Sequence, residues 1–423
     1  MRQDVIQAQL NNGLTVVLKE MHHAPVISWW IYYRVGSRNE VPGITGVSHW
    51  CEHMMFKGSP KFPAGALDRT ISRAGGAWNA YTWIDYTAYH ETMPADRIDI
   101  ALQLEADRMQ NAHFAPDAVA SERTVIISER QGAENHPLFW LREEMQAAAF
   151  RVHPYHHEIL GDMTDLEHMT RDDLYNYYRR YYHPGNAVAV AVGDFDTDTM
   201  LARIRSLYEP IPPGEPIPPV TRTEPEQRGT RRVTLVREGS TAYVSMAVHA
   251  PVGTDDDYFR LTVLDNILSG SSGASNTNKT SRLYRALVGT QKAAHVHGSL
   301  SATIDPYIYS LTATVTPNHS PAEVEAALLA EVERMMQEPP SATELAQAKK
   351  QAKAYFAFES ESITGQADWL GTSHMIAGSI EWVDNYMERL LAVSAEEVQD
   401  VAQRYLKPPK RNFGWVVPAN EKS

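Results

Sequence analysis

An internal repeat constrains the fold of this 423-residue chain more than any other sequence feature. The segment 170–184 matches the segment 394–408 without a gap. Each copy starts with Thr or Ser and carries an acidic residue three positions later, a pattern that favours a helix N-terminus. Each copy then reaches a proline that precedes an apolar run. We therefore predict two copies of one architecture, because the length suits two domains of about 200 residues.

A proline-rich segment separates the two copies. Glu209 to Gly229 contains seven prolines. Since proline has no amide hydrogen, such a segment cannot form a helix or a central strand, and we expect an extended, semi-rigid linker. The predicted organisation is an N-terminal domain at 1–208, the linker at 209–229, and a C-terminal domain at 230–423.

Composition and charge exclude several classes of protein. The chain is 43% apolar and 22% charged, as in ordinary globular proteins. Its net charge of -13 argues against nucleic acid and anionic membranes as partners. No apolar run is long enough to predict a membrane-spanning helix. The N-terminus lacks the apolar core of a signal peptide, so we expect a cytoplasmic protein, or a periplasmic one if a leader has been removed.

The most specific chemical motif is His-x-x-Glu-His at 49–53. Residues four apart share one face of a helix, so His49 and His53 would present two imidazoles to one metal ion. Glu52 stands beside that face, where a general base can reach a metal-bound water without being a ligand. A solvent-exposed helix with the same residues is the alternative. The apolar neighbours of the motif favour buried imidazoles, which need partners.

A later predicted helix offers the third ligand. Glu122 and Glu129 lie seven residues apart, so they share a face with the apolar Val125 and Ile126 between them. Glu129 would complete a His-His-Glu set with an open position for water. Glu122 would orient a histidine through its other ring nitrogen. Either glutamate alone would be interpreted as a solvated surface residue, but the pair together with the motif favours a metal site.

The second half of the chain lacks these groups. The spacing of the repeat places Ala346 opposite Glu122 and Lys353 opposite Glu129, and it sets the segment 273–277, which has no histidine, opposite the motif. The second domain therefore copies the architecture without the metal chemistry. The histidine pair at 156–157 and the following Glu158 are interpreted as surface residues, since adjacent side chains of an extended segment point apart.

Together these features resemble the insulinase/pitrilysin family of zinc metallopeptidases. The similar branch consists of short two-domain subunits, including the mitochondrial processing peptidase and bacterial zinc proteases. The likeness covers nearly the whole chain and includes five further short segments that resemble family motifs, at 56–58, 79–82, 105–109, 153–155 and 281–284.

The resemblance implies an α+β fold and a function. Each of two homologous domains would be a mainly antiparallel sheet with helices packed on one face, joined by the Pro-rich linker. Two such subunits would enclose a chamber. One zinc ion per chain, on His49, His53 and Glu129, would support the hydrolysis of peptide bonds in peptides or unfolded proteins, with Glu52 activating water. Asn79 and Ala80 would lie on the strand to which the peptide adds in extended form.

One departure from the family pattern predicts a partner. Active members carry an arginine and a tyrosine seven residues apart after the Ser-Arg-Leu segment, where this chain has Val288 and His295. Valine cannot replace a charged, planar donor. The chain would then be the zinc-bearing subunit of a heterodimer with a homologous subunit that carries the pair, although a homodimer stays open. The alternative function is a non-catalytic scaffold or binding subunit, which the intact ligand set disfavours.

Overall fold

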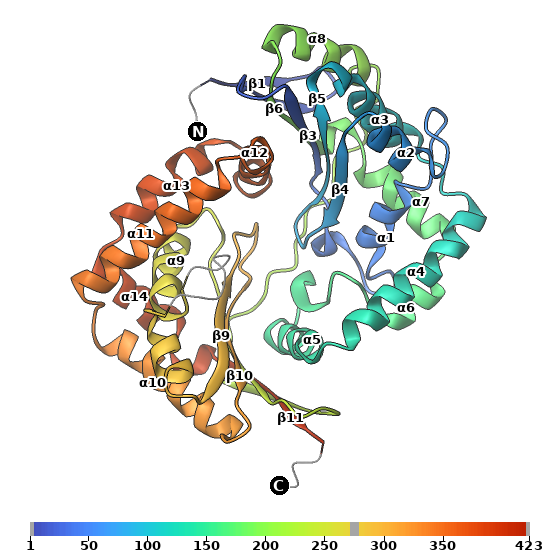
Figure 1. Ribbon diagram of the computed structural model, residues 1–423. Coiled ribbons are helices and arrows are strands. Elements are labelled where there is room, and N and C mark those ends of the chain that lie inside the picture. The colour runs from blue at the N-terminus through green and yellow to red at the C-terminus, as the bar shows by residue number, and fades with distance from the viewer. Residues whose placement is uncertain (1–3, 271–278, 420–423) are drawn as a thin grey trace. The chain divides into compact units, whose positions relative to one another are not determined.

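The computed structural model describes residues 4–270 and 279–419, which form two compact units (Figure 1). The first unit combines Met1–Gly132, His157–Arg222 and Glu359–Asp384, and the second combines Ala133–His156, Thr223–Phe358 and Asn385–Ser423. Neither unit is continuous in sequence. The domain bounds 1–208 and 230–423 stay a prediction about the two halves of the chain, and each compact unit also takes in a segment from the other half.

The first unit is built on a six-stranded sheet. Its order is β1-β2-β6-β3-β5-β4, and every neighbouring pair is antiparallel except the parallel pair of β2 and β6. Strand β4 therefore forms one edge of the sheet. The bounds are β1 Val5–Gln9, β2 Thr15–Glu20, β3 Val26–Tyr33, β4 Ala77–Thr82, β5 Thr87–Pro94 and β6 Ala187–Gly193.

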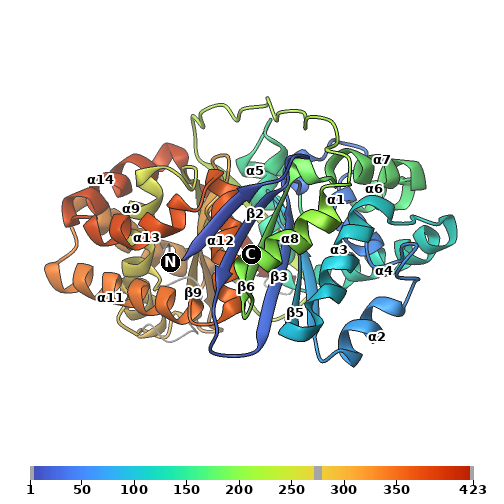
Figure 2. The same ribbon diagram turned by 90° about the horizontal axis from the view of Figure 1, so that it is seen from above.

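Most helices of the first unit cover one face of this sheet (Figures 1 and 2). Their apolar side chains form one core with Trp29, Ile31 and Tyr33 of β3. These helices are α1 Val47–Met54, α2 Ala66–Arg73, α3 Ile98–Asn111, α4 Pro116–Glu134, α6 Met163–His168, α7 Arg171–Tyr181 and α8 Thr197–Tyr208.

One helix, α12 (Ile363–Ala377), packs against β3 and β6 on the opposite face. The hydroxyl of Tyr32 on β3 donates to Asp368 of α12 at 2.9 Å. All seven residues of β6 are buried, because this strand is covered on both faces. Double coverage explains why β6 is a continuous apolar run rather than an alternating pattern.

The second unit repeats the topology with a five-stranded sheet of order β7-β11-β8-β10-β9. The pair of β7 and β11 is parallel and the other pairs are antiparallel. These strands correspond in order to β2, β6, β3, β5 and β4. The bounds are β7 Arg231–Arg237, β8 Tyr243–His249, β9 Ala293–Leu300, β10 Ile308–Val315 and β11 Asn412–Pro418. The α+β class with two mainly antiparallel sheets, predicted from the sequence, is confirmed.

The helices of the second unit also lie on both faces of its sheet. On one face, Trp415 of β11 donates through its indole N–H to Glu325 of α10. On the other face, Leu141 and Met145 of α5 pack against Val416. The helices are α5 Pro137–Ala149, α9 Asp256–Leu268, α10 Pro321–Gln337, α11 Ala342–Glu359, α13 Glu381–Ala392 and α14 Ala395–Tyr405.

The helices α5 and α12 are counterparts that have exchanged sheets. Each follows the long helix of its own half, α4 or α11, yet α5 covers the sheet of the second unit and α12 that of the first. The sequence predicted helices on one face only. The exchanged helix adds a layer on the second face and makes both units discontinuous.

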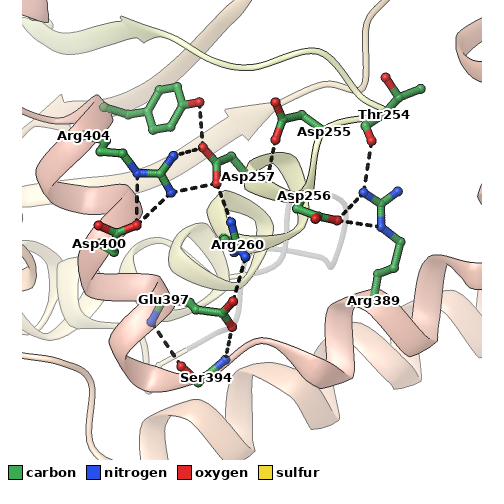
Figure 3. A network of polar contacts seen from close by, with 11 residues as sticks. Thr254, Asp255, Asp256, Asp257, Arg260, Arg389, Ser394, Glu397, Asp400 and Arg404 are labelled. Carbon is green, nitrogen blue, oxygen red and sulfur yellow. Dashed lines mark hydrogen bonds and ion pairs between the residues drawn. The ribbon is translucent and has the colours of Figure 1, made fainter.

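A polar network joins α9 and α14 in the second unit (Figure 3). Asp257 accepts hydrogen bonds from Arg260 and Arg404, and Arg260 also donates to Glu397 at 2.7 Å. Glu397 and Ser394 form the capping box that the repeat predicted at the start of α14. The capping residues of the repeat thus also fix helix packing in this unit.

The Pro-rich segment contains neither helix nor strand, as predicted. Its Glu224 accepts hydrogen bonds from the backbone amides of Arg151, Val152 and His153 at 2.8–3.1 Å, which ties the segment to the second unit. Within residues 4–270 and 279–419, no helix is both long and apolar enough to cross a membrane.

Packing of α12 on β3 predicts the effect of a small substitution. A Cβ atom at Gly371 would lie 2.1 Å from the ring of Tyr32. That ring is buried and its hydroxyl is held by Asp368, so it cannot move aside. We expect Gly371→Ala to lower the free energy of unfolding by about 1–3 kcal/mol, as overpacking does.

The matched control is Gly132→Ala on the exposed side of α4, where a Cβ atom would meet nothing within 4 Å. Alanine favours the helix, so this variant should gain up to about 1 kcal/mol. Urea unfolding of both variants checks the prediction. A Gly371→Ala chain as stable as the wild type would contradict it.

Candidate metal centre

Helix α1, which carries the motif, starts at a buried carboxylate. Gly46 adopts a left-handed φ of 84° before the first turn. The carboxylate of Glu40 accepts the amide hydrogens of Gly46 at 2.8 Å and Ser48 at 2.9 Å. The first amides of a helix have no partner within the helix, and an acidic group there also interacts favourably with the helix dipole. Glu40 therefore fixes the position of α1.

His157 lies on the other side of this carboxylate. Its Nε2 is 2.8 Å from Oε2 of Glu40. Burial opposes a charge on the ring, but the hydrogen bond and the charge of Glu40, together with the charges of Asp162 and Asp165, outweigh it and raise the pKa of His157. His157 and Glu158 are both buried, so their interpretation as surface residues was wrong. The short 3-10 helix Pro154–His156 turns the chain, and His157 then points inward instead of alternating along an extended segment.

The imidazole rings of His49 and His53 lie close together. Their ring centroids are 4.7 Å apart and the planes cross at 68°. His49 is buried, and burial followed by the repulsion of His53 lowers its pKa to about 3. A neutral imidazole is the form that binds metal. The Nδ1 atom of His49 is buried without a hydrogen-bond partner among the described residues.

Helix α4 brings Glu129 to the same place. One oxygen, Oε2, lies 3.7 Å from Nε2 of His49 and 3.6 Å from Nε2 of His53. These separations are too long for strong hydrogen bonds. Two ligands about 2.0–2.1 Å from one tetrahedral ion are roughly 3.3–3.4 Å apart, so the spacing suits a single metal. Within the described parts of the chain, this is the one group of three histidine, cysteine, aspartate or glutamate residues whose ligand atoms all lie within 4.8 Å of one another.

Glu122 lies behind His53. Its Oε1 is 2.8 Å from Nδ1 of His53, which leaves Nε2 facing Glu129. Its other oxygen forms an ion pair with Lys57, which lies in the 56–58 segment, but this contact was not predicted. Burial pushes the pKa of Glu122 up, but the bonds from His53 and Lys57 outweigh it and lower the pKa.

Glu52 lies beside the three candidate ligands and outside their group. It is 7% exposed, and Oγ1 of Thr82 donates to its Oε2 at 2.8 Å. Burial raises the pKa of Glu52, and the bond from Thr82 opposes only part of this shift. A carboxylate with a raised pKa is better matched to proton transfer near neutral pH. Thr82 lies in the 79–82 segment, but its contact with Glu52 was not predicted.

Asn79 and Ala80 lie on the edge strand β4. Asn79 is paired with His90 and Ala80 with Tyr89 of β5. The hairpin closes through Trp83 N–H to the carbonyl of Tyr86 at 2.8 Å. Because hydrogen-bonded and non-bonded pairs alternate, the backbone groups of residues 80 and 82 point away from β5, toward the open edge. The amide of Ala80 currently donates to the side chain of Asn79 at 3.0 Å.

The residues predicted to replace the family arginine and tyrosine belong to the second unit. Val288 ends a short π-helix, Tyr284–Val288, and His295 lies on β9 opposite Thr314. Ala346 and Lys353 lie on α11, the counterpart of α4, and both are exposed. The segment 273–277, placed opposite the motif by the repeat, lies outside the described residues.

Two family models match most of the chain. Residues 15–163 match a model described as insulinase, peptidase family M16, and residues 168–352 match one described as the M16 inactive domain. The chain belongs to the insulinase family. Its M16 relatives include the zinc protease PqqE of Helicobacter pylori, which is 28% identical over 97% of this chain and 92% of the relative. The β subunit of the mitochondrial-processing peptidase of Lentinula edodes is 26% identical over 94% and 86% of the two chains.

Solved structures give the same family fold. A protease from Helicobacter pylori superposes with a TM-score of 0.93 at 26% identity, over 98% of this chain and 99% of that one. An M16 inactive domain from Pseudomonas fluorescens has a TM-score of 0.89 at 17% identity, over 99% of both chains. The insulinase-family assignment agrees with relatives that are named zinc proteases and with a His-His-Glu group that could hold a metal ion.

The Glu40–His157 pair predicts a pH-dependent contribution to stability. Because the folded pKa of His157 is raised, the contribution is fully present below the ordinary pKa of about 6.5 and is lost as pH rises through the raised value. Glutamine at 157 can donate a hydrogen bond but carries no charge. His157→Gln should therefore destabilise the chain more at pH 6 than at pH 9.

Urea unfolding at both pH values, in a chelating buffer so that metal does not contribute, measures this difference. The exposed His23→Gln is the control. An equal effect of His157→Gln at the two pH values would show that the pair is not charged in the folded chain.

Proposed function

We propose that this chain is a zinc-dependent endopeptidase that hydrolyses peptide bonds of peptides or unfolded proteins. One zinc ion would be held by His49, His53 and Glu129. The observation that carries the proposal is the convergence of these three ligand atoms within 4.8 Å, with Glu52 beside them. Relatives named zinc proteases support it.

The ligand set suits a catalytic site, since three protein ligands leave a fourth position for water. When bound, zinc would supply Lewis acidity and lower the pKa of that water. Glu52 would take a proton from the water as the water oxygen attacks the scissile carbonyl carbon. The same carboxyl group would give the proton to the leaving amine as the C–N bond breaks. Glu122 would hold His53 in the tautomer that presents Nε2 to the metal.

The edge of β4 suits an extended peptide. The outward-facing backbone groups of residues 80 and 82 can pair with a peptide strand once the amide of Ala80 leaves the side chain of Asn79, and such pairing gives affinity with loose sequence preference. Thr82 on this edge also contacts Glu52, so a peptide docked there would lie close to the base. Asn79 would contribute a polar side chain to the same strand.

We further propose that full activity needs a homologous partner subunit. The motivation is the presence of Val288 and His295 where active members of the family have arginine and tyrosine. A heterodimer with a subunit that carries this pair is the preferred arrangement, and a homodimer is the alternative. One relative is itself named as a subunit. A non-catalytic binding role is the competing function, and an intact ligand set with a base argues against it.

The metal assignment predicts distinct effects for two glutamates. Glu129→Gln should lose most of the zinc, because it removes a charged ligand. Glu52→Gln should keep about one zinc per chain and lose about 10²–10⁴ in kcat, the contribution of a general base. Zinc content after loading and desalting, together with peptide turnover, checks both. Asp117→Asn, an exposed carboxylate on the same helix as Glu129, is the control. Full zinc retention in Glu129→Ala would refute the ligand set.

The docking edge predicts the effect of removing one amide. Ala80→Pro deletes an N–H that points to the open edge, whereas Ala80→Gly keeps it. One lost backbone hydrogen bond, at about 0.5–1.5 kcal/mol, should weaken peptide binding about 2- to 12-fold. Fluorescence anisotropy with a labelled peptide, in the zinc-loaded Glu52→Gln background, gives the affinity without turnover. Equal affinities for the proline and glycine variants would place the docking strand elsewhere.

The missing arginine and tyrosine predict low activity of the chain alone. Loss of one carbonyl-stabilising donor costs about 10²–10³ in kcat, so the isolated chain should retain only residual turnover. The test compares the zinc-loaded chain with and without a homologous subunit that has both groups at the positions of Val288 and His295. Equal rates would mean that this chain is a complete enzyme.

A further inference from the structure

The general base proposed above has a single protein hydrogen-bond donor among the described residues. Thr82 Oγ1 donates to Oε2 of Glu52 at 2.8 Å. The second oxygen, Oε1, has no such partner there and stays available to a water molecule. Because a buried carboxylate side chain can otherwise rotate about its bonds, this one contact decides which oxygen is held and which is free.

The two residues of this contact are tied together by a third segment. At the far end of the 35–48 segment, the amides of Gly46 and Ser48 bind Glu40 and fix the start of α1. At its near end, the amide of Arg38 donates to the carbonyl of Ile84 at 2.9 Å, in the hairpin that joins β4 to β5. The carbonyl of Val35 accepts from Thr87 at 2.8 Å in the same hairpin. One short stretch of chain therefore contacts both the helix that carries Glu52 and the hairpin that carries Thr82.

Gly36 sets how closely the hairpin approaches this segment. A Cβ atom at Gly36 would lie 2.2 Å from the carbonyl oxygen of Trp83 and 2.7 Å from the carbonyl carbon of Ile84. Both are backbone atoms, which cannot move aside as a flexible side chain can. Only glycine allows this approach, so backbone packing fixes the distance between the hairpin and the segment that leads into α1.

Thr82 has a second property that matters for the base. Its backbone N–H and C=O point to the open edge of β4, where an added peptide strand would bind, while its hydroxyl reaches Glu52 on α1. We propose that Thr82 is a positioning residue for the general base: it holds one oxygen of Glu52 and couples the orientation of that carboxylate to the strand that docks the peptide. This inference rests on the proposed peptidase function.

The test separates positioning from a merely structural role. Thr82→Val keeps the shape of the side chain and removes the donor, Thr82→Ser keeps the donor, and Thr82→Ala is a smaller variant without the donor in case valine impairs folding. Each zinc-loaded full chain, alone and with a homologous subunit, is assayed on an internally quenched fluorescent peptide. Zinc content and melting temperature are measured alongside kcat and KM.

We expect Thr82→Val and Thr82→Ala to lower kcat about tenfold or more, with KM and zinc content within about twofold of wild type, because the donor acts on the base and not on the metal. Thr82→Ser should restore kcat to within about threefold. Thr70→Val, which removes a hydroxyl bonded to a backbone carbonyl in α2, is the matched control and should leave kcat unchanged.

Each other result counts against the proposal. Wild-type kcat in Thr82→Val or Thr82→Ala would overturn it, and so would a serine variant as slow as the valine variant. A loss of kcat that follows the loss of zinc or of thermal stability would assign Thr82 a structural role only. Absence of any turnover that depends on Glu52 in the wild type would overturn the peptidase function itself and this inference with it.

Discussion

The candidate metal centre depends on the buried carboxylate of Glu40. Three residues of the candidate site lie on α1, and this helix of eight residues is too short to hold its position by its own hydrogen bonds. Glu40 accepts two of its first amide hydrogens, and His157 from a distant segment balances the buried charge. A buried charge is costly unless it is paired and hydrogen-bonded. Here the hydrogen bonds that Glu40 needs come from the start of α1, so the same bonds that satisfy the carboxylate also fix the helix.

The exchanged helices explain how two similar halves build two units with both sheet faces covered. In each half the strand after the repeated helix is largely apolar: β6 is apolar throughout and β11 is apolar except for Asn412, so each strand requires cover on two faces. In both units a glycine lets the exchanged helix lie close to the sheet: Gly371 of α12 packs against Tyr32, and Gly414 of β11 packs against Met145 of α5. The sequence analysis predicted neither α5 nor α12, and an apolar helix face does not specify which of two similar sheets it will cover. This is why the fold class was predictable and the composition of the units was not.

The same distinction applies within the site. His49, His53, Glu129 and Glu122 could be predicted because helical spacing puts donors of the right type on one face, and the structure brings these side chains together. The partners that hold them, Glu40, His157, Lys57 and Thr82, were not predicted. Their contacts join residues far apart in the chain or run from a side chain to a backbone amide, and neither leaves a periodic signal. His157 was misread for a related reason, since a single turn of 3-10 helix reverses the direction expected of an extended segment.

The two units also show why the fold could be kept while the chemistry differs between them. Glu129 is 46% exposed at its side chain, and its counterpart in the second half, Lys353, is exposed on α11. Ala346 is exposed too, although its counterpart Glu122 is buried. Substitutions at exposed positions such as those of Glu129 and Lys353 remove no core contacts, so they cost little stability. The core strands cannot change so freely, because their packing on both faces depends on volume and close approach. Core packing therefore constrains the strands of both units, whereas an exposed position such as that of Glu129 or Lys353 can change without disturbing it.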